Sequence, residues 1–123
     1  MEPQRQPPEG RPTFVFTDIE DSSRIKRVIG DRHYFDNVLT PHHSLIREAI
    51  TQHNGYEVKT IGDSFMLAFD APQEAVDCVL AIQNGLKSKP ITTTDTKPLK
   101  VRIGIHSCVQ APLLYKDIAG TWD

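Results

Sequence analysis

The sequence predicts an α+β fold in one domain, with a sheet that carries its helices on one face. Runs of β-branched and aromatic residues, which are typical of strands, alternate along the chain with stretches whose apolar residues recur at helical spacing. A Gly-Asp pair at positions 62 and 63 joins two of the strand-like runs, as expected for a tight hairpin. The 123 residues are enough for one such domain and too few for two.

The first strand and the first helix are predicted on either side of residue 20. Residues 13–19, TFVFTDI, are mostly aromatic or β-branched and indicate a buried strand. Asp21, Ser22 and Ser23 follow, and side chains of these types cap helix N-termini. A short helix is therefore expected to run from there towards Gly30.

A longer helical stretch comes next, and its second half is better defined. Thr40 suits an N-cap, Pro41 suits the first helical position, and Asn54-Gly55 suits the end. Pro41 would either kink one long helix or separate two shorter ones. His42-His43 lacks a metal-ligand spacing such as HExxH, so a position on the helix surface is expected.

The rest of the chain predicts three strands and one helix. YEVKTI (56–61) and SFMLAF (64–69) flank the Gly-Asp turn, and Asp70 with Gln73 resembles a capping box that opens a helix. Apolar and polar residues alternate over 99–106, which indicates a half-buried strand. The resulting order of strand, helix pair, strand, strand, helix and strand is the ferredoxin-like β-α-β-β-α-β arrangement.

This topology brings together two carboxylates that are distant in sequence. A right-handed crossover leaves a gap between the first two strands, and the third strand fills it antiparallel to both. Asp18 ends the first strand where Asp63 starts the third, so the two side chains should lie close together. Like charges repel unless a cation lies between them, and Mg²⁺ and Mn²⁺ prefer carboxylate oxygens. Singly, Asp63 suits a turn and Asp18 suits a helix cap; together they favour a metal site for phosphoryl transfer.

Composition argues against several other classes of function. The net charge of −2, with both signs mixed along the chain, gives no basic surface for nucleic acid or an anionic membrane. No apolar run approaches the roughly 20 residues of a membrane helix, and the proline-rich residues 1–12 predict a flexible tail rather than a secretory signal. Cys78 and Cys108 match no disulfide framework and no zinc pattern, so free thiols and a cytoplasmic location are expected.

Three segments resemble the class III nucleotidyl cyclases, the adenylyl and guanylyl cyclase catalytic domain. They are TFVFTDIEDSSR, EVKTIGDSFM and KVRIGIH, in the order and spacing of that family. The resemblance covers nearly everything from Thr13 onwards, so residues 13–123 are interpreted as part of such a domain. It implies that two identical or similar domains pair head to tail and bind ATP at their interface. The nucleotide's 3′-oxygen then attacks the α-phosphate, giving cyclic AMP and pyrophosphate.

The resemblance also implies roles in metal and phosphate binding. Asp18 and Asp63 match the two aspartates that hold a pair of catalytic Mg²⁺ or Mn²⁺ ions. Ile19 matches the residue whose backbone carbonyl also reaches a metal. Backbone amides of the following run, Glu20 to Ser23 with Asp21 and Ser22 inside it, match those that hold the β- and γ-phosphates, and a helix N-terminus suits an anion on physical grounds as well.

Two further residues are implied in base recognition. Lys59 matches a lysine that hydrogen-bonds adenine from the partner chain, and an ammonium suits N1 of adenine better than the protonated N1 of guanine. ATP is therefore the expected substrate. Asp123 matches the aspartate that reads the adenine amino group. Without the motif, Lys59 would be interpreted as an ordinary solvent-facing strand lysine.

The family pattern continues past residue 123, with an asparagine and an arginine that stabilise the transition state and with the closing strands. A pair of metal-binding aspartates without that arginine stabilises the transition state less well. These 123 residues alone are therefore expected to be inactive or nearly so. Two departures lie within the chain. Asp21 replaces a usual glycine beside the phosphate loop, and Ser107-Cys108 replaces a usual threonine-glycine.

Other interpretations of the sequence remain open. A non-catalytic cyclase-like module would bind nucleotide or a partner domain for regulation, and both Asp21 and Cys108 would suit it. A diguanylate cyclase or a polymerase palm shares the fold type, but IGDSF lacks the Gly-Gly-Asp/Glu-Glu-Phe hairpin of the former. The fold alone also allows a plain protein-interaction module.

Overall fold

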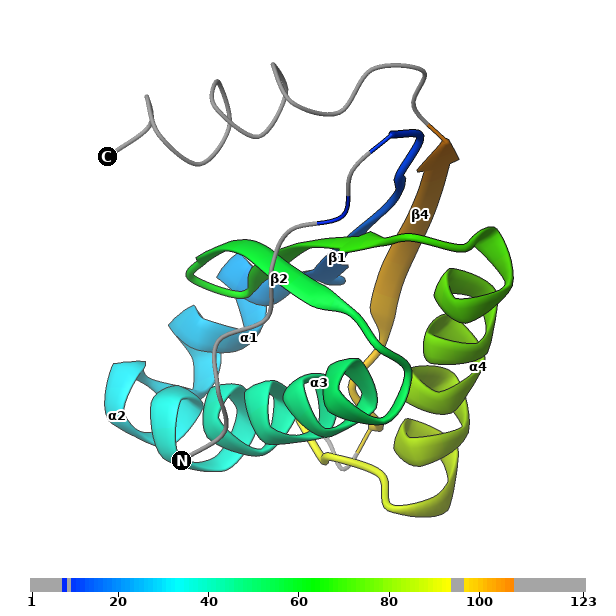
Figure 1. The fold of residues 1–123 in the computed structure, drawn as a ribbon. Coiled ribbons are helices and arrows are strands. Elements are labelled where there is room, and N and C mark those ends of the chain that lie inside the picture. Colours follow the sequence, from blue (N-terminus) through cyan, green and yellow to red (C-terminus); the bar gives the residue numbers. More distant parts are fainter. Residues whose placement is uncertain (1–7, 9, 94–96, 108–123) are drawn as a thin grey trace.

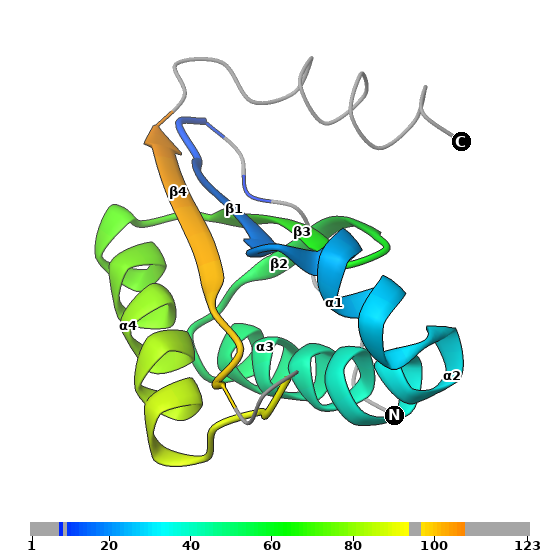
Figure 2. The same ribbon diagram turned by 180° about the vertical axis from the view of Figure 1, so that it is seen from behind.

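The computed structural model describes residues 8, 10–93 and 97–107. It contains a four-stranded antiparallel sheet in the order β2-β3-β1-β4, with helices against one face (Figures 1 and 2). The α+β, ferredoxin-like element order predicted from the sequence is confirmed. The elements in chain order are β1 (Thr13–Ile19), α1 (Ser22–Ile29), α2 (Asp31–Tyr34), the π-helical turn η1 (Phe35–Leu39), α3 (Thr40–Gln52), β2 (Tyr56–Ile61), β3 (Ser64–Phe69), α4 (Pro72–Ser88) and β4 (Val101–Ser107).

Strand β1 lies at the centre of the sheet and separates two environments. Val15 pairs with Leu67 of β3 on one side and with Ile105 of β4 on the other. Val15 and Leu67 are fully buried in the core beneath the helices. Because side chains alternate along a strand, Phe14, Phe16 and Asp18 point to the opposite face, which we call the far face.

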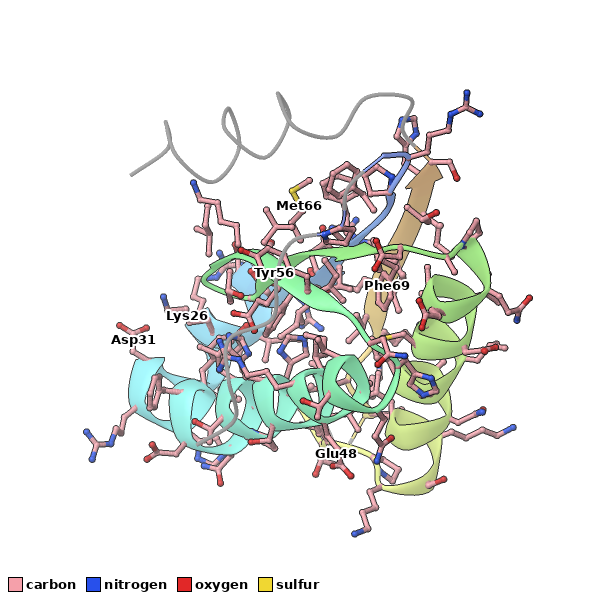
Figure 3. All side chains as sticks on the ribbon, viewed as in Figure 1. Lys26, Asp31, Glu48, Tyr56, Met66 and Phe69 are labelled. Atoms are coloured by element: carbon pink, nitrogen blue, oxygen red, sulfur yellow. The ribbon has the colours of Figure 1, made fainter. Side chains whose placement is uncertain are left out.

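The far face has an apolar end and a polar end. Phe14, Met66 and Ala68 form a second buried cluster there, and Met66 projects on the side of the sheet away from α3 (Figure 3). Asp18 and Arg102 pair with each other at the opposite end of the same face. The far face therefore carries a buried apolar cluster at one end and an exposed charged pair at the other.

The predicted hairpin is confirmed. Strands β2 and β3 pair around Gly62, whose φ of 58° lies in the left-handed region that glycine adopts without strain. A register shift between Glu57 and Lys59 marks a bulge in β2, which increases the local twist of this edge strand. The turn carries Asp63 to the end of β1.

Residues 31–52 form one continuous helix, not two. The chain passes from α2 through η1 into α3 without leaving helical dihedral angles, and Thr40 has φ −60° and ψ −52°. Thr40 is therefore not an N-cap, and its hydroxyl donates to the carbonyl of Phe35. Pro41 lacks an N–H and its ring crowds the preceding turn, and the wider π-helical turn just before it accommodates both effects.

Two other helix starts differ from the sequence prediction. Asp21 precedes α1 with φ 64° and makes no side-chain cap; its carboxylate accepts from Arg24 instead, at 2.7 Å. The capping box predicted for Asp70 and Gln73 is wrong, since Ala71 is the N-cap of α4 and the Gln73 amide donates to Asp77. Both helices start without the side-chain bonds that their sequences suggest.

Two composition-based expectations can be compared with the described residues. Cys78 is a buried free thiol, as predicted, and burial raises its pKa to about 11. Cys108 lies outside the described residues, as does most of the predicted tail, although Pro8 and Pro12 are described and buried. In the described part of the chain, no helix has both the length and the apolar character needed to cross a bilayer.

Candidate functional site

Asp63 is anchored to the end of the first strand. Its carboxylate oxygen Oδ2 accepts a hydrogen bond from the backbone N–H of Ile19 at 3.0 Å, across 44 positions of sequence. The positive φ of Gly62 lets the hairpin turn tightly enough to direct Asp63 towards β1. The two segments meet here, because the Asp63 side chain touches the residue that follows Asp18.

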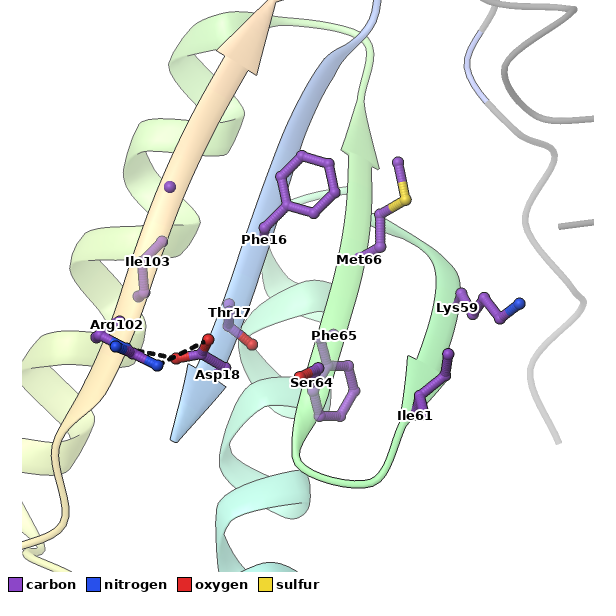
Figure 4. Close-up of a pocket in the computed structure, with 11 residues that line it drawn as sticks. Phe16, Thr17, Asp18, Lys59, Ile61, Ser64, Phe65, Met66, Arg102 and Ile103 are labelled. Carbon is purple, nitrogen blue, oxygen red and sulfur yellow. Dashed lines mark hydrogen bonds and ion pairs between the residues drawn. The ribbon is translucent and has the colours of Figure 1, made fainter. Parts of the chain in front are cut away.

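The Asp18 carboxylate faces the far side of the sheet and holds an arginine. Arg102 Nε donates to Oδ1 at 2.8 Å and its Nη2 donates to Oδ2 at 3.2 Å, so the ion pair is bidentate (Figure 4). The pairing follows from the register, since Asp18 lies opposite Arg102 in the β1–β4 ladder. The Asp18 side chain is 42% exposed, so solvent and ions reach it.

The two aspartates line different cavities. Asp18, Lys59 and Arg102 line a cavity of about 680 Å³ on the far face, together with apolar side chains such as Phe16 and Ile61. Asp63 and Lys26 line a second cavity of about 540 Å³, next to α2 and η1. Both volumes are within the range of about 300–1,000 Å³ that is usual for small-molecule sites. The end of β1 therefore lies between two cavities, one lined by Asp18 and the other by Asp31 and Asp63.

The start of α1 borders this region, and its backbone amides are used unequally. The Glu20 N–H donates to the carbonyl of Lys100 at 2.8 Å, which extends the β1–β4 ladder. The first intrahelical bond runs from the Ile25 N–H to the carbonyl of Asp21, so the amides of Ser22 and Ser23 precede it. Of the run predicted to hold phosphates, the amide of Glu20 already has a partner.

Lys59 lies across the far face from Arg102. It pairs with Met66 of β3, directly after the bulge, and lines the larger cavity (Figure 4). Its Nζ atom is buried, unlike that of an ordinary solvent-facing strand lysine. Asp123, the other residue predicted to recognise the base, lies outside the described residues.

Three rings lie near the Asp63 turn on its helix side, of which Tyr34 and His42 are buried and His43 is half-buried. Burial, with a smaller contribution from the Asp63 carboxylate, raises the pKa of Tyr34 to about 12. His42 is fully buried, contrary to the expected surface position. Burial, with a smaller contribution from the neighbouring His43, lowers the pKa of His42 to about 4. Burial also lowers the pKa of His43. All three rings are therefore neutral at pH 7.

Sequence reasoning missed two residues that contact the candidate site. Arg102 is part of the KVRIGIH segment, but alternation along the strand identifies it only as a polar position. His43 Nε2 lies 2.9 Å from the carbonyl of Gly62, and its sequence context gave no sign of that contact. Among the described residues, no group of three or more histidine, cysteine or acidic side chains is arranged to hold a metal. Any metal here would need backbone or nucleotide oxygens as well.

Comparison with known proteins gives consistent matches. A family model described as "Adenylate and Guanylate cyclase catalytic domain" matches residues 5–111. The receptor-type adenylate cyclase GRESAG 4.3 of Trypanosoma brucei brucei is 42% identical over 76 residues, which are 62% of this chain and 6% of that protein. The chain thus spans only a small part of this relative's length.

Two solved structures resemble the fold. An adenylate cyclase from Trypanosoma brucei, solved in its monomeric state, superposes with a TM-score of 0.64 at 29% identity, over 85% of this chain and 59% of that chain. The guanylate cyclase domain of RhGC from Catenaria anguillulae, in complex with GTP, gives a TM-score of 0.70 at 22% identity, over 81% and 57%. At 22% identity, the likeness to the RhGC domain supports the fold alone.

Proposed function

The chain belongs to the adenylate and guanylate cyclase catalytic domain family, and on that basis we propose that it supplies the metal-binding part of a site that converts ATP to cyclic AMP and pyrophosphate. In this proposal, Asp18, Asp63 and the backbone carbonyl of Ile19 hold two Mg²⁺ or Mn²⁺ ions. The observation that carries it is the bond from the Ile19 N–H to the Asp63 carboxylate, which brings the third strand's acidic group to the end of the first.

The donor set fits hard divalent cations. Two carboxylates and one carbonyl are all oxygen ligands, and Mg²⁺ completes such a set with water and substrate phosphates. The Asp18 carboxylate already binds a cationic group, the guanidinium of Arg102. When bound, the two ions would polarise the α-phosphate, favour deprotonation of the attacking hydroxyl and stabilise charge on the leaving group.

The chain's own residues then bind and orient the nucleotide. The amides of Ser22 and Ser23, at the N-terminus of α1, would donate to the phosphates. The pairing of Asp21 with Arg24 offsets part of the carboxylate's repulsion of a triphosphate. Lys59 would donate to adenine of a nucleotide held mainly by the partner, and that role is the reason to propose ATP rather than GTP.

A second cyclase domain is part of the proposal. The aspartates of one chain would bind the metals of one nucleotide, whereas Lys59 of the same chain would bind the adenine of the nucleotide held mainly by the partner. The partner would be an identical or related domain, paired head to tail. Exposed apolar side chains on the far face, Phe16 at 47% and Ile61 at 57%, support an interface there. Since the family's asparagine and arginine lie outside these 123 residues, we expect the chain by itself to form little or no cyclic AMP.

Binding rather than turnover is therefore the direct test. Titration of Mn²⁺ together with a non-hydrolysable ATP analogue should show metal-dependent nucleotide binding, and Asp18→Ala or Asp63→Ala should abolish it. Asp36→Ala is a matched control, because Asp36 also pairs with an arginine in an exposed ion pair. Unchanged binding in both site variants would refute the metal clamp.

A non-catalytic nucleotide-binding or dimerisation module is the second candidate, and Asp21 is the observation that favours it. The residue holds a left-handed φ of 64°, a conformation that glycine adopts without cost, and it adds a negative charge beside the proposed phosphate site. The same titration separates the candidates. Equal nucleotide affinity with and without Mn²⁺ would favour the module over the enzyme.

A further inference from the structure

Two adjacent histidines connect the buried side of α3 to the turn that carries Asp63. His42 Nδ1 lies 2.9 Å from His43 Nδ1, and His43 Nε2 lies 2.9 Å from the carbonyl oxygen of Gly62. Gly62 directly precedes Asp63, whose carboxylate is held from the other side by the Ile19 N–H. The turn is thus contacted by the central strand and by a histidine from the helix.

The hydrogen-bond partners define where the protons lie. A carbonyl oxygen can only accept, so His43 Nε2 carries the proton and donates to Gly62. In a neutral ring, His43 Nδ1 is then an acceptor, and the proton between the two rings belongs to His42 Nδ1. His42 Nε2 is left as an unprotonated acceptor, buried and without a hydrogen-bond partner among the described residues. Burial lowers the pKa of both rings, which supports the neutral forms.

This arrangement costs stability that an apolar residue would not. A buried acceptor without a partner loses its hydration, whereas a leucine of similar size would fill the same place without that loss. His42 is fully buried against the Phe65 ring, with 5.9 Å between ring centroids. What the imidazole provides and an apolar side chain cannot is a donor to His43.

The surroundings also fix the orientation of the second ring. His43 packs edge-on against Phe65, with ring centroids 4.8 Å apart. Arg47 lies over the same Phe65 ring at 5.4 Å and is itself held by Glu57 through two bonds of 3.1 and 3.2 Å. These charges flank His43 on α3 and β2, and Asp63 is the third charged group near it. A ring held this way presents Nε2 to Gly62 in one direction.

The geometry points to His42 and His43 as positioning residues, a relay that holds the Gly62–Asp63 turn at the end of β1 and thereby sets the direction of the Asp63 carboxylate. The inference rests on the proposed function, because it gives Asp63 a metal to bind. It goes beyond the proposed function by assigning the orientation of the Asp63 carboxylate to two histidine rings on α3, of which His42 is buried and His43 is half-buried. Neither histidine touches metal or nucleotide.

A pair of conservative variants tests the relay in the 123-residue chain. The amide nitrogen of a glutamine can occupy the place of His Nε2, whereas that of an asparagine lies near Nδ1 and cannot reach Gly62. His43→Gln should therefore retain the affinity for Mn²⁺, added alone, and His43→Asn should weaken it by about tenfold, as is typical when a group supporting a metal ligand is lost. His33→Asn is the control, because His33 is an exposed histidine on α2.

Nitrogen chemical shifts provide a readout that packing alone would not predict. In the unsubstituted chain, long-range ¹H–¹⁵N spectra should identify His42 as the Nδ1–H tautomer and His43 as the Nε2–H tautomer. Amide exchange at Ile19, whose N–H donates to the Asp63 carboxylate, should quicken in His43→Asn and remain slow in His43→Gln. The opposite tautomers, or equal Ile19 exchange in the two variants, would overturn the relay.

The outcomes also separate this inference from the proposed function. If Asp63→Asn removes Mn²⁺ binding while His43→Asn leaves it unchanged, the metal site stands and the relay is wrong. If Asp63→Asn has no effect on Mn²⁺ binding, the proposed metal site fails. The tautomers and the Ile19 exchange rates then decide the relay by themselves.

Discussion

At the scale of single residues, the Asp18–Arg102 pair decides how readily the far-face carboxylate can accept a metal. The pair is bidentate, but the side chains are 42% and 65% exposed. Ion pairs this exposed are screened by solvent and contribute little, so displacing Arg102 should reduce metal affinity only slightly. The arginine thus competes weakly with a divalent ion, and the observed pairing is compatible with the proposed clamp.

Burial of the His42 ring should make the free energy of unfolding depend on pH. Its pKa in the folded chain is about 4, below the ordinary 6.5 expected after unfolding. Between these values the unfolded chain takes up a proton that the folded chain excludes, so the free energy of unfolding falls as the pH falls from 6.5 towards 4. At pH 5 the loss from this group should be about 2 kcal/mol relative to pH 7.5.

Urea denaturation at the two pH values measures this loss. Carboxylates also titrate over this range, so the effect of His42 is isolated by comparison with the variant His42→Leu. In that variant, the fall in the free energy of unfolding between pH 7.5 and 5 should be smaller by about 2 kcal/mol. His33→Leu, at an exposed position, should keep the full change. An identical pH dependence in His42→Leu would contradict the buried neutral ring.

At the scale of elements, the wide turn η1 explains how the long helix keeps one buried stripe. Its buried side chains recur every fourth residue, a spacing that drifts by about 40° per step around a regular α-helix. A π-helical turn has more residues per turn and counteracts the drift. The stripe consists of Tyr34, Val38, His42, Ile46 and Ile50.

A side chain added at Gly55, just after the end of that helix, should lower the stability of the fold. A Cβ at this position would lie 2.9 Å from the Phe69 ring and 3.0 Å from Ile50 Cγ2, and both are core side chains. Gly55→Ala should therefore lower the free energy of unfolding by about 1–3 kcal/mol, the usual cost of overpacking.

Chemical denaturation checks this prediction, with Gly104→Ala in β4 as the control. A Cβ at Gly104 meets no atom within 4 Å, so that variant should stay within about 0.5 kcal/mol of the unsubstituted chain. Equal stabilities of the two variants would mean that the contact between Gly55 and Phe69 is looser than described.

At the scale of the whole molecule, the far face is the surface on which we propose that a second domain packs. Phe16→Lys places a charge on this face beside the larger cavity. Because a buried charge must be desolvated, the variant should weaken self-association by about tenfold or more. Sedimentation over a range of concentrations would measure it.

Leu80→Lys serves as the control for this experiment. Leu80 lies on α4 and is 54% exposed, which is comparable to 47% for Phe16. Its variant should associate as the unsubstituted chain does. If Phe16→Lys and Leu80→Lys had the same effect, or if neither had any, the proposed interface would not lie on the far face.

The element order could be predicted from sequence because each strand and helix carries its own periodicity, and the hairpin because Gly62 and Asp63 encode its turn. The nearness of Asp63 to β1 followed from that topology. The partner of Asp18 could not be predicted, because Arg102 lies 84 positions away and depends on register. The burial of His42 was also missed, because the π-helical turn η1, which keeps this residue in the buried row of the long helix, was not predicted from the sequence.

The central position of β1 has a consequence for the order in which the chain can fold. The first strand to be synthesised has no neighbour until β3 follows, and its second edge stays unpaired until β4 exists. The Asp63–Ile19 contact spans 44 positions and the Asp18–Arg102 contact spans 84. Contacts of such length form late, so a nascent chain can gain the Asp63–Ile19 contact only once β3 exists and the Asp18–Arg102 contact only once β4 exists.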